Sequence, residues 1–329
     1  MASADDTLRA LDPAQRAAFT ISSLSSGGQL PEEKANKFVE LATNDTPILS
    51  QCQVEKMASS VKKLPKIAFA GRIVRTGPGD DTALGDSVRA APTPSETTLT
   101  TKEYVAVVPV GYQALEENVE MDAFEAKLMR MIAIQWGVDM EELALSSDTT
   151  IDDVTMVAHG FARQDGWLKL ITTNVVNASS AYVSALLLEQ LRVSVPSRFR
   201  RQKCHQFFVG EKAANKWRET VAARATVAGD AALMNADLPL VGGTKVIEAP
   251  NLLVTSGSPD TAPVLYTDPK NLLFGVRTGI VGGNSQGISM KVEDKPKYSR
   301  VNIYVRARVA FGVMHEPAAA KGTNFRATA

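Results

Sequence analysis

The 329-residue sequence contains only two cysteines, Cys52 and Cys204, so a disulfide framework cannot be built from it. Disulfides persist in oxidising compartments, and their scarcity indicates a protein made in a reducing one. The sequence also lacks a run of about 18 apolar residues, which a membrane-spanning helix requires. Its first residues are acidic and contain no apolar stretch, so we expect no secretory signal. These absences predict a chain with no membrane partner.

Neither sign of charge is in excess, because 36 lysine and arginine residues balance 36 aspartate and glutamate residues. Domains dedicated to nucleic-acid binding are usually basic, so this balance disfavours that class of protein. The densest basic run covers residues 198–203, where Phe199 lies among cationic residues. An aromatic residue among cations suits nucleic acid. The interpretation we favour is a solvent-exposed connection that contacts a neighbouring subunit.

Patterns typical of catalysis or metal binding are also missing. The histidines, His159, His205 and His315, form no His-Glu-x-x-His pattern, and none has zinc-ligand spacing to a cysteine. Cys204 and His205 are adjacent, which predicts opposite faces of a strand, whereas a catalytic dyad needs contact between the side chains. No Gly-x-Ser-x-Gly elbow occurs. We therefore expect no catalytic residue, no cofactor and no metal, and a protein that is not an enzyme.

A glycine-rich, charged segment, RIVRTGPGDDTALGDSVRAA, occupies residues 72–91. It is not a phosphate-binding loop, because no Lys-Ser or Lys-Thr follows Gly77 and Gly85, and a strand pattern rather than a helix comes next. The adjacent aspartates Asp80 and Asp81 could bind a hard cation. Adjacent aspartates at the tip of a ribbon are more often simply solvated, so we favour that interpretation.

The glycine-rich segment is flanked by strand patterns at residues 64–75 and 97–112. In the first, Ile67 and Phe69 fall on the same face by strict alternation, which is typical of a strand with one apolar face. Proline at position 109 disfavours a central position in a sheet. The two strands predict a long ribbon with the glycine-rich segment at its tip. An isolated ribbon is marginally stable in water, so it must lie against another surface.

The remaining patterns mix helices and strands. Apolar residues recur near helical spacing at 121–145, the longest helical pattern, and shorter helices are predicted at 179–195 and 211–223. A short buried strand is predicted at 206–210. At 301–314, strict alternation predicts a long strand with one buried face. The chain is therefore expected to adopt an α+β fold.

Three segments of the sequence show a resemblance to a known family. They are the helix-proline-basic-strand passage at 186–210, LPLVGGTKVIEAPNL at 238–252, and DPKNLLFGVRTGI at 268–280, which leads to RVNIYVRARVAFGVMHEPAAA. Together with the order of elements, they resemble the major capsid proteins of tailed bacteriophages, which have the Hong Kong 97-type fold. The resemblance covers nearly the whole chain, although it depends on element order and local phrases rather than on one sharp motif.

The resemblance implies how the chain is divided into parts. An N-terminal arm comes first, followed by an extended β-ribbon loop, a peripheral domain with a long spine helix, an axial domain around a local symmetry axis, and a return to the peripheral domain with a C-terminal tail. The corresponding ranges are 1–50, 60–112, 113–174 with the spine helix at 121–145, 175–290, and 291–329.

The resemblance also implies a function and partners. Many copies would assemble as pentamers and hexamers into an icosahedral phage head that encloses double-stranded DNA and contacts its phosphates without sequence specificity. Because only about 50 residues precede the ribbon, a separate scaffolding protein is expected. The other implied partners are a portal and, as an option, a decoration protein. The implied location is the capsid of the virion, after assembly in the bacterial host cytoplasm.

Two alternatives remain open at the level of sequence. An encapsulin-type compartment has the same fold and encloses a cargo enzyme instead of DNA. A cytosolic enzyme with a loop-built site belongs to another class of protein, and the absence of a convergent catalytic constellation disfavours it.

The capsid interpretation explains the glycine-rich segment as the tip of a ribbon that reaches over an adjacent subunit. A protruding ribbon cannot bury its surface on its own chain, so a partner must cover it. Charges of both signs near the tip suit many weak polar contacts with an identical neighbour, and such contacts set register more than affinity. The candidate contact residues are Arg72, Arg75, Asp80, Asp81, Asp86 and Arg89.

Overall fold

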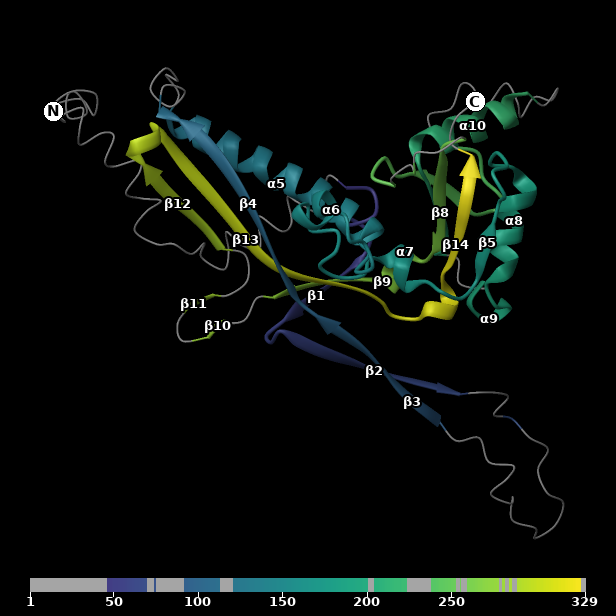
Figure 1. Ribbon diagram of the computed structural model, residues 1–329. Helices are drawn as coiled ribbons and strands as arrows, with labels where there is room; N and C mark the ends of the chain where they lie inside the picture. Colours follow the sequence, from purple (N-terminus) through teal and green to yellow (C-terminus); the bar gives the residue numbers. More distant parts are fainter. Residues whose placement is uncertain are drawn as a thin grey trace, which may run out of the picture.

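The computed structural model describes residues 46–69, 74, 92–112, 121–200, 204–223, 238–252, 255, 259–277, 280–281, 284–285 and 289–326. In this part of the chain two β-sheets lie beside each other, and a narrow ribbon extends away from both (Figure 1). Helices and strands are mixed along the chain, which confirms the predicted α+β class.

The first sheet is built around β13 (Arg300–Val313), which pairs with three other strands. β12 and β4 flank its first part, and β9 pairs with its last part. β1 pairs in turn with β9 in parallel. The bounds of these partners are β12 (Ser289–Lys295), β4 (Lys102–Gly111), β9 (Leu272–Arg277) and β1 (Gln53–Met57). Among the described strands β4 pairs only with β13, so Pro109 lies on an edge strand, where a missing N–H is tolerated.

The long helix α5 (Met121–Ser146) lies along one face of the first sheet (Figure 1), as the apolar repeat at 121–145 predicted. Its side chains Trp136, Met140 and Leu143 pack in one core with Ile303 of β13. A helix of this length places several turns of apolar side chains over the sheet.

The alternation predicted for β13 holds from Ile303 to Val309, whereas Asn302, which was predicted on the open face, is only 6% exposed. Val305 and Ala307 are fully buried, whereas Arg306 between them is exposed. Beyond Val309 both faces of the strand are buried, and the prediction of a single buried face was wrong there. The reason is that the base of the ribbon covers the second face at Ala310.

The second sheet has the order β5-β14-β8-β6-β7. Two helices, α8 (Ala185–Ser194) and α10 (Glu211–Ala222), share a core with one of its faces. The strand predicted at 206–210 and the helix predicted at 211–223 are confirmed. The bounds of the strands are β5 (Val175–Asn177), β14 (Ala320–Arg326), β8 (Thr261–Thr267), β6 (Gln206–Val209) and β7 (Lys245–Glu248).

Helix α8 begins at Ala185 rather than at the predicted residue 179. Ser179 and Ser180 have φ angles of 49° and 63°, which are incompatible with a right-handed helix. The helix starts after Ser184, whose Oγ accepts a hydrogen bond from the backbone N–H of Leu187 as an N-cap.

Sheet membership differs from the predicted ranges in three places. β4 lies within the predicted ribbon range 60–112 but pairs with β13 in the first sheet. β9 lies within the predicted axial range 175–290 but pairs with β1 and β13 in the first sheet. β14 lies within the predicted return segment 291–329 but sits between β5 and β8 in the second sheet. Alternation identifies a strand and its buried face, but it does not identify the partner strand.

The two sheets are joined by one hydrophobic core. Phe208 and Leu265 project from one face of the second sheet into the same cluster as Phe274 and Phe311 of the first sheet. Trp167 lies in this cluster as well, at the start of the short helix α7 (Trp167–Leu170), and is fully buried. The sheets are therefore packed against each other and are not independent units.

The ribbon consists of β2 (Val61–Phe69) and β3 (Pro92–Thr100), paired antiparallel. It runs away from both sheets (Figure 1). The predicted ribbon is confirmed for these residues, although the second predicted strand, 97–112, is divided at Thr101 into β3 and β4.

The remaining elements are short. None of the helices in the described ranges is long and apolar enough to cross a membrane. The short elements are α6 (Val154–Ala158), α9 (Ser197–Arg200), β10 (Ile280–Val281), β11 (Asn284–Ser285) and the 3-10 turns Pro269–Asn271, Pro296–Tyr298 and Glu316–Ala318.

Candidate subunit-contact surfaces

The β2–β3 ribbon leaves most of its surface open to solvent. Every residue of β3 from Pro92 to Glu96 is exposed, and Ile67 on β2 is 73% exposed. Neither strand pairs with another described strand. A two-stranded ribbon is at best marginally stable in water, so these apolar side chains and open edges require a covering surface.

The base of the ribbon is held to the first sheet by a small apolar cluster. Leu99 of β3 packs with Met57, Leu273 and Ala310, and all four side chains are buried. A β-carbon at Gly312 would clash with Leu99 Cδ2, so glycine at this position leaves the space that the ribbon occupies. The direction of the ribbon is therefore set by close packing at one end.

Polar contacts add to this attachment. Lys66 Nζ donates a hydrogen bond to the backbone carbonyl of Met314, and Thr97 Oγ1 donates to the same oxygen over 3.4 Å. Burial lowers the pKa of Lys66. The pKa of the nearby His315 is lowered by burial and by the positive charges of Lys66 and Arg198. The ribbon base therefore lies beside a row of basic groups.

Glu141 of α5 fastens the chain just before it enters β1. Its carboxylate accepts hydrogen bonds from the backbone N–H groups of Ile48 (2.9 Å) and Leu49 (3.0 Å), and from Asn251 Nδ2 (3.1 Å). The residue is fully buried, and burial raises the pKa of the carboxyl although these hydrogen bonds oppose the shift. One side chain thus joins α5, the turn before β1 and the loop after β7.

Helix α8 presents an apolar strip that the core does not cover. Leu186 and Val193 are 70% and 51% exposed, although both are large apolar residues. They are seven residues apart, which places them on one side of the helix. Together with Gln190 they line a shallow hollow on the surface of the second sheet's helical layer.

The predicted contact residues cannot be placed on any of these surfaces. They all lie outside the described residues, as does most of the expected arm, of which only residues 46–50 are described. The residues concerned are Arg72, Arg75, Asp80, Asp81, Asp86 and Arg89.

The cysteines and histidines lie in separate places. Cys52 is partly buried, and burial raises its pKa to about 12, whereas Cys204 is exposed. His205 is buried, and its Nε2–H donates to the carbonyl of Ala318 over 3.0 Å. Cys204 and His205 lie just before β6, so they are not on the strand predicted to hold them on opposite faces, although the two residues differ in burial. Over the described ranges, no three His, Cys, Asp or Glu side chains gather closely enough to hold a metal ion.

The described part of the basic run lies on α9. The guanidinium of Arg198 lies 4.6 Å from the centre of the Phe199 ring, and that ring stacks on His315 with centroids 6.4 Å apart. Arg198 is exposed, and Phe199 is half-buried. The aromatic ring is therefore used within the subunit, which favours a solvent-exposed connection over a base-stacking surface.

Sequence reasoning did not identify Glu141 or the strip on α8. The signal for Glu141 was weak: it is one acidic residue inside the apolar stripe of the longest helix. Buried carboxylates are rare unless they are paired or hydrogen-bonded, so an acid on a core-facing position indicates a polar partner without naming it.

The fold and these surfaces define a class of protein. The body is folded around a shared core, while its ribbon and a helix face present apolar groups that the described chain leaves open. Subunits of closed protein shells have this character, because neighbouring copies complete their surfaces.

Comparisons with known proteins identify the shell. No protein-family model matches the chain. This chain is 31% identical over 271 residues to the prophage capsid protein YqbE of Bacillus subtilis (strain 168). The aligned region covers 80% of this chain and 85% of that protein. The chain therefore belongs to the major capsid proteins of tailed bacteriophages, and it is a structural protein of the phage capsid.

Solved structures agree on the fold. A satellite phage P4 procapsid with its size determination (Sid) protein is similar over 96% of this chain and 98% of the other, with a TM-score of 0.66 and 12% identity. The SrpI encapsulin of Synechococcus elongatus PCC 7942 is similar over 87% of this chain and 90% of the encapsulin chain, with a TM-score of 0.56 and 13% identity. These likenesses show the Hong Kong 97-type fold, and the sequence relative separates the capsid from the encapsulin interpretation.

Proposed function

We propose that copies of this chain assemble as pentamers and hexamers, which close an icosahedral head around double-stranded DNA. The exposed β2–β3 ribbon carries the proposal, because it folds as a projection on which apolar side chains such as Ile67 and Val61 have no cover on the described chain. The sequence relative is a prophage capsid protein, which supports the same role.

The parts of the subunit follow from this proposal. The first sheet with α5 is the peripheral domain, and the second sheet with α8 and α10 is the axial domain. The β2–β3 ribbon belongs to the extended loop predicted at 60–112, and residues 1–50 form the arm. The sheet pairing supports three changes to the predicted ranges: β4 and β9 belong with the peripheral domain, and β14 belongs with the axial domain.

Partners are part of the proposal. The ribbon tip, with its three arginines and three aspartates, contacts a neighbouring copy. Packaged DNA meets the inner surface through phosphate contacts without sequence specificity. Assembly takes place in the host cytoplasm with a separate scaffolding protein and a portal, and a decoration protein can join the outside. The role is mechanical, with no catalytic step and no cofactor.

Electron microscopy of the purified protein, together with sedimentation over a range of concentrations, tests the proposal. We expect capsomers and closed polyhedral particles, which grow in number with concentration because each weak contact is repeated many times in a shell. A protein that stays monomeric at every concentration, with or without a co-expressed scaffolding protein, would contradict it.

The encapsulin alternative has the same fold, as the likeness to the SrpI encapsulin shows, whereas the sequence relative is a prophage capsid protein. Particles purified from infected cells and treated with nuclease separate the two functions. Protected double-stranded DNA inside the particles supports the phage head, whereas a protein cargo without DNA supports the compartment.

A further inference from the structure

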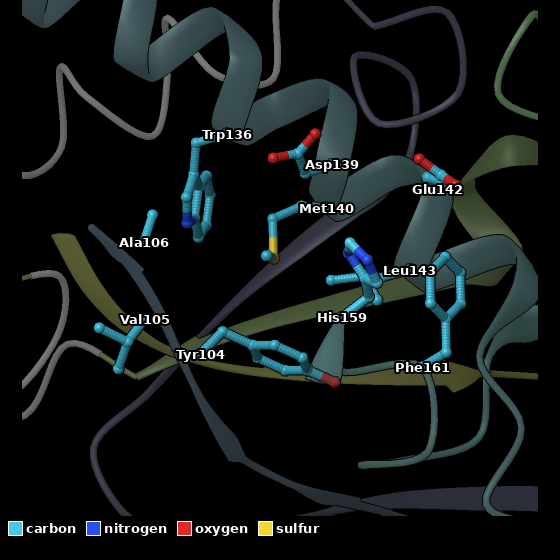
Figure 2. A pocket seen from close by; sticks show the side chains of 10 residues that line it. All are labelled: Tyr104, Val105, Ala106, Trp136, Asp139, Met140, Glu142, Leu143, His159 and Phe161. Carbon is cyan, nitrogen blue, oxygen red and sulfur yellow. The ribbon is translucent and has the colours of Figure 1, made fainter. Parts of the chain in front are cut away.

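A small hollow lies between α5, β4 and the turn after α6 (Figure 2). Trp136 comes from the helix, Tyr104 from the strand, and Phe161 from the turn. These aromatic residues form part of its wall, and Val105 at its edge is 50% exposed. The wall of the hollow is continuous with the core that joins the two sheets, because Tyr104, Trp136 and Phe161 also belong to that core.

Two carboxylates stand on the helical side of the hollow (Figure 2). Asp139 accepts a hydrogen bond from Gln135 Nε2 over 2.8 Å, and neither Asp139 nor Glu142 forms an ion pair with another described residue. Burial and the charge of Asp139 raise the pKa of Glu142, while the nearby His159 lowers it. The two acids therefore place negative charge along the helical side of the hollow, with His159 as the basic side chain in its wall.

A second feature also indicates a missing partner. Tyr104 is only 7% exposed, and its hydroxyl forms no hydrogen bond of normal geometry in the described structure. Burial raises the pKa of the Tyr104 phenol to about 12, while Gln164 and the positive charge of Arg163 oppose the shift. The amide nitrogen of Gln164 also lacks a partner of normal geometry. The ring is placed by Gly160 (φ 86°), where a β-carbon would come within 2.9 Å of Tyr104 Cε1. A buried hydroxyl without a partner is costly, so a group that enters the hollow and donates to it would be stabilised.

The chemistry of the wall selects the kind of group. Aromatic faces attract an ammonium or guanidinium group, and desolvation strengthens the attraction. Carboxylates at the rim attract the same cations, and a phenol oxygen can accept their N–H groups. The cavity volume is about 220 Å³, below the range of roughly 300 Å³ and more that is usual for pockets that bind whole small molecules. The end of one long side chain is a better match in size.

The balance of charge indicates where that side chain comes from. The whole chain carries equal numbers of acidic and basic residues, so each copy also has lysine and arginine side chains that can serve as the occupant. In a shell, identical copies bring such complementary surfaces together, and head-to-tail contacts use a different surface on each side.

We propose that this hollow, with Asp139 and Glu142 at its rim and Tyr104 within, receives a lysine or arginine side chain from a second copy of the chain. The proposal rests on the shell function proposed above and adds a specific contact to it. The entering cation donates a hydrogen bond to the Tyr104 hydroxyl and pairs with the carboxylates at the rim.

The test compares assembly of the wild type with that of the double variant Asp139→Asn, Glu142→Gln. The amide side chains keep the size of the acids and remove their charge. We expect the protein concentration needed for half-assembly at about 0.1 M NaCl to rise at least about tenfold, because a partly buried charge contact is lost. Tyr104→Phe should cause a smaller rise in the same direction. Unfolding of the free subunits should be little changed in each variant.

A matched control is the pair Asp152→Asn, Glu211→Gln, which removes one exposed aspartate and one exposed glutamate away from the hollow. Its assembly should match that of the wild type. If the hollow variant also assembles like the wild type, the hollow is not a contact and the inference fails. If the wild type itself does not assemble, the shell function fails instead, so the two failures are distinct.

A free polyamine would offer the same chemistry, so each protein is also assembled with and without spermidine. Wild-type assembly that needs no spermidine, together with weakened assembly of the hollow variant, supports a side chain of a second copy. Wild-type assembly that appears only with added spermidine, and is lost in the hollow variant, would overturn the second copy as the occupant.

Discussion

Among single residues, Gly312 decides whether the ribbon can dock on the first sheet. Its missing side chain leaves space for Leu99, which is fully buried and cannot turn away without disturbing Met57 and Leu273. Overpacking a core site costs about 1–3 kcal/mol, so Gly312→Ala should lower the free energy of unfolding by that amount. Urea denaturation of the free subunit measures it. Gly111→Ala is the control, because a β-carbon there meets no atom within 4 Å and should have little effect.

Rescue of the Gly312→Ala variant tests the cause of its instability. Leu99→Val removes the clashing carbon, so the double variant should recover part of the lost stability, although each single substitution is destabilising. Purely additive losses would mean that the two side chains do not meet.

Glu141 gives a second test at this scale. Glu141→Ala leaves two buried backbone N–H groups and the amide of Asn251 without an acceptor, and each buried unsatisfied group costs about 1–3 kcal/mol. The free energy of unfolding should fall by several kcal/mol in all. Glu141→Gln keeps one carbonyl oxygen and should lose less. Equal losses in both variants would contradict the role of the hydrogen bonds.

The pH dependence of Glu141 has a defined sign. Its pKa in the folded state is raised above the ordinary 4.5, so the folded protein binds the proton more tightly than the unfolded chain. The stabilisation is therefore complete below pH 4.5 and is lost as pH rises through the raised pKa. The difference in unfolding free energy between the wild type and Glu141→Gln should decline over this range and then level off. Denaturation of both proteins at several pH values measures this difference in unfolding free energy. A difference that grows with pH would contradict the raised pKa of Glu141.

At the scale of the elements, shortening the β2–β3 ribbon should prevent assembly while leaving the folding of the two sheets nearly unchanged. The outer part of the ribbon extends away from both sheets (Figure 1), whereas Lys66 and Leu99 attach its base to the first sheet. Residues 67–94 can be replaced by Asn-Gly, because Lys66 lies opposite Ser95 in the register and a two-residue turn can join them. The shortened subunit should unfold at nearly the wild-type temperature and should fail to form shells. Calorimetry and electron microscopy measure these two outcomes, and normal shells would refute the role of the ribbon.

The helices and strands also show what local pattern can predict. Strict alternation identified β13, and the 3.6-residue period identified α5 and α10. The start of α8 was missed because Ser179 and Ser180 adopt left-handed backbone angles that no apolar period reveals. The cap at Ser184 is a local signal that could have corrected it.

In the whole molecule, the shared core should make the two sheets unfold together. Phe208 of the second sheet packs in one cluster with Phe274 and Trp167, so neither sheet can open without exposing apolar area of the other. Tryptophan fluorescence and far-ultraviolet circular dichroism should give coincident urea transitions for the free subunit. Phe208→Ala should shift both transitions together, by about 3–5 kcal/mol. Separate transitions would show two independent folding units.

The contact surfaces are less predictable than the core, because they depend on parts of the chain that are distant in sequence. The hollow at Tyr104 combines a strand, a helix and a turn, and none of these segments carries a sequence motif for it. The strip on α8 is visible in sequence only as one more apolar position, since exposed and buried leucines look alike until the partner helix and sheet are placed.

The amino-acid sequence by itself determined the elements, the ribbon with its charged tip, the lack of disulfides and, through local phrases, the capsid family. These follow from short-range periodicity and composition, which report which side of an element is buried. Only the tertiary structure decided that β9 belongs to the first sheet and β14 to the second, that Glu141 holds the turn before β1, and that both sheets share one core. The physical reason is that pairing and packing depend on shape complementarity between segments far apart in the chain, and the period of one segment contains no information about its partner.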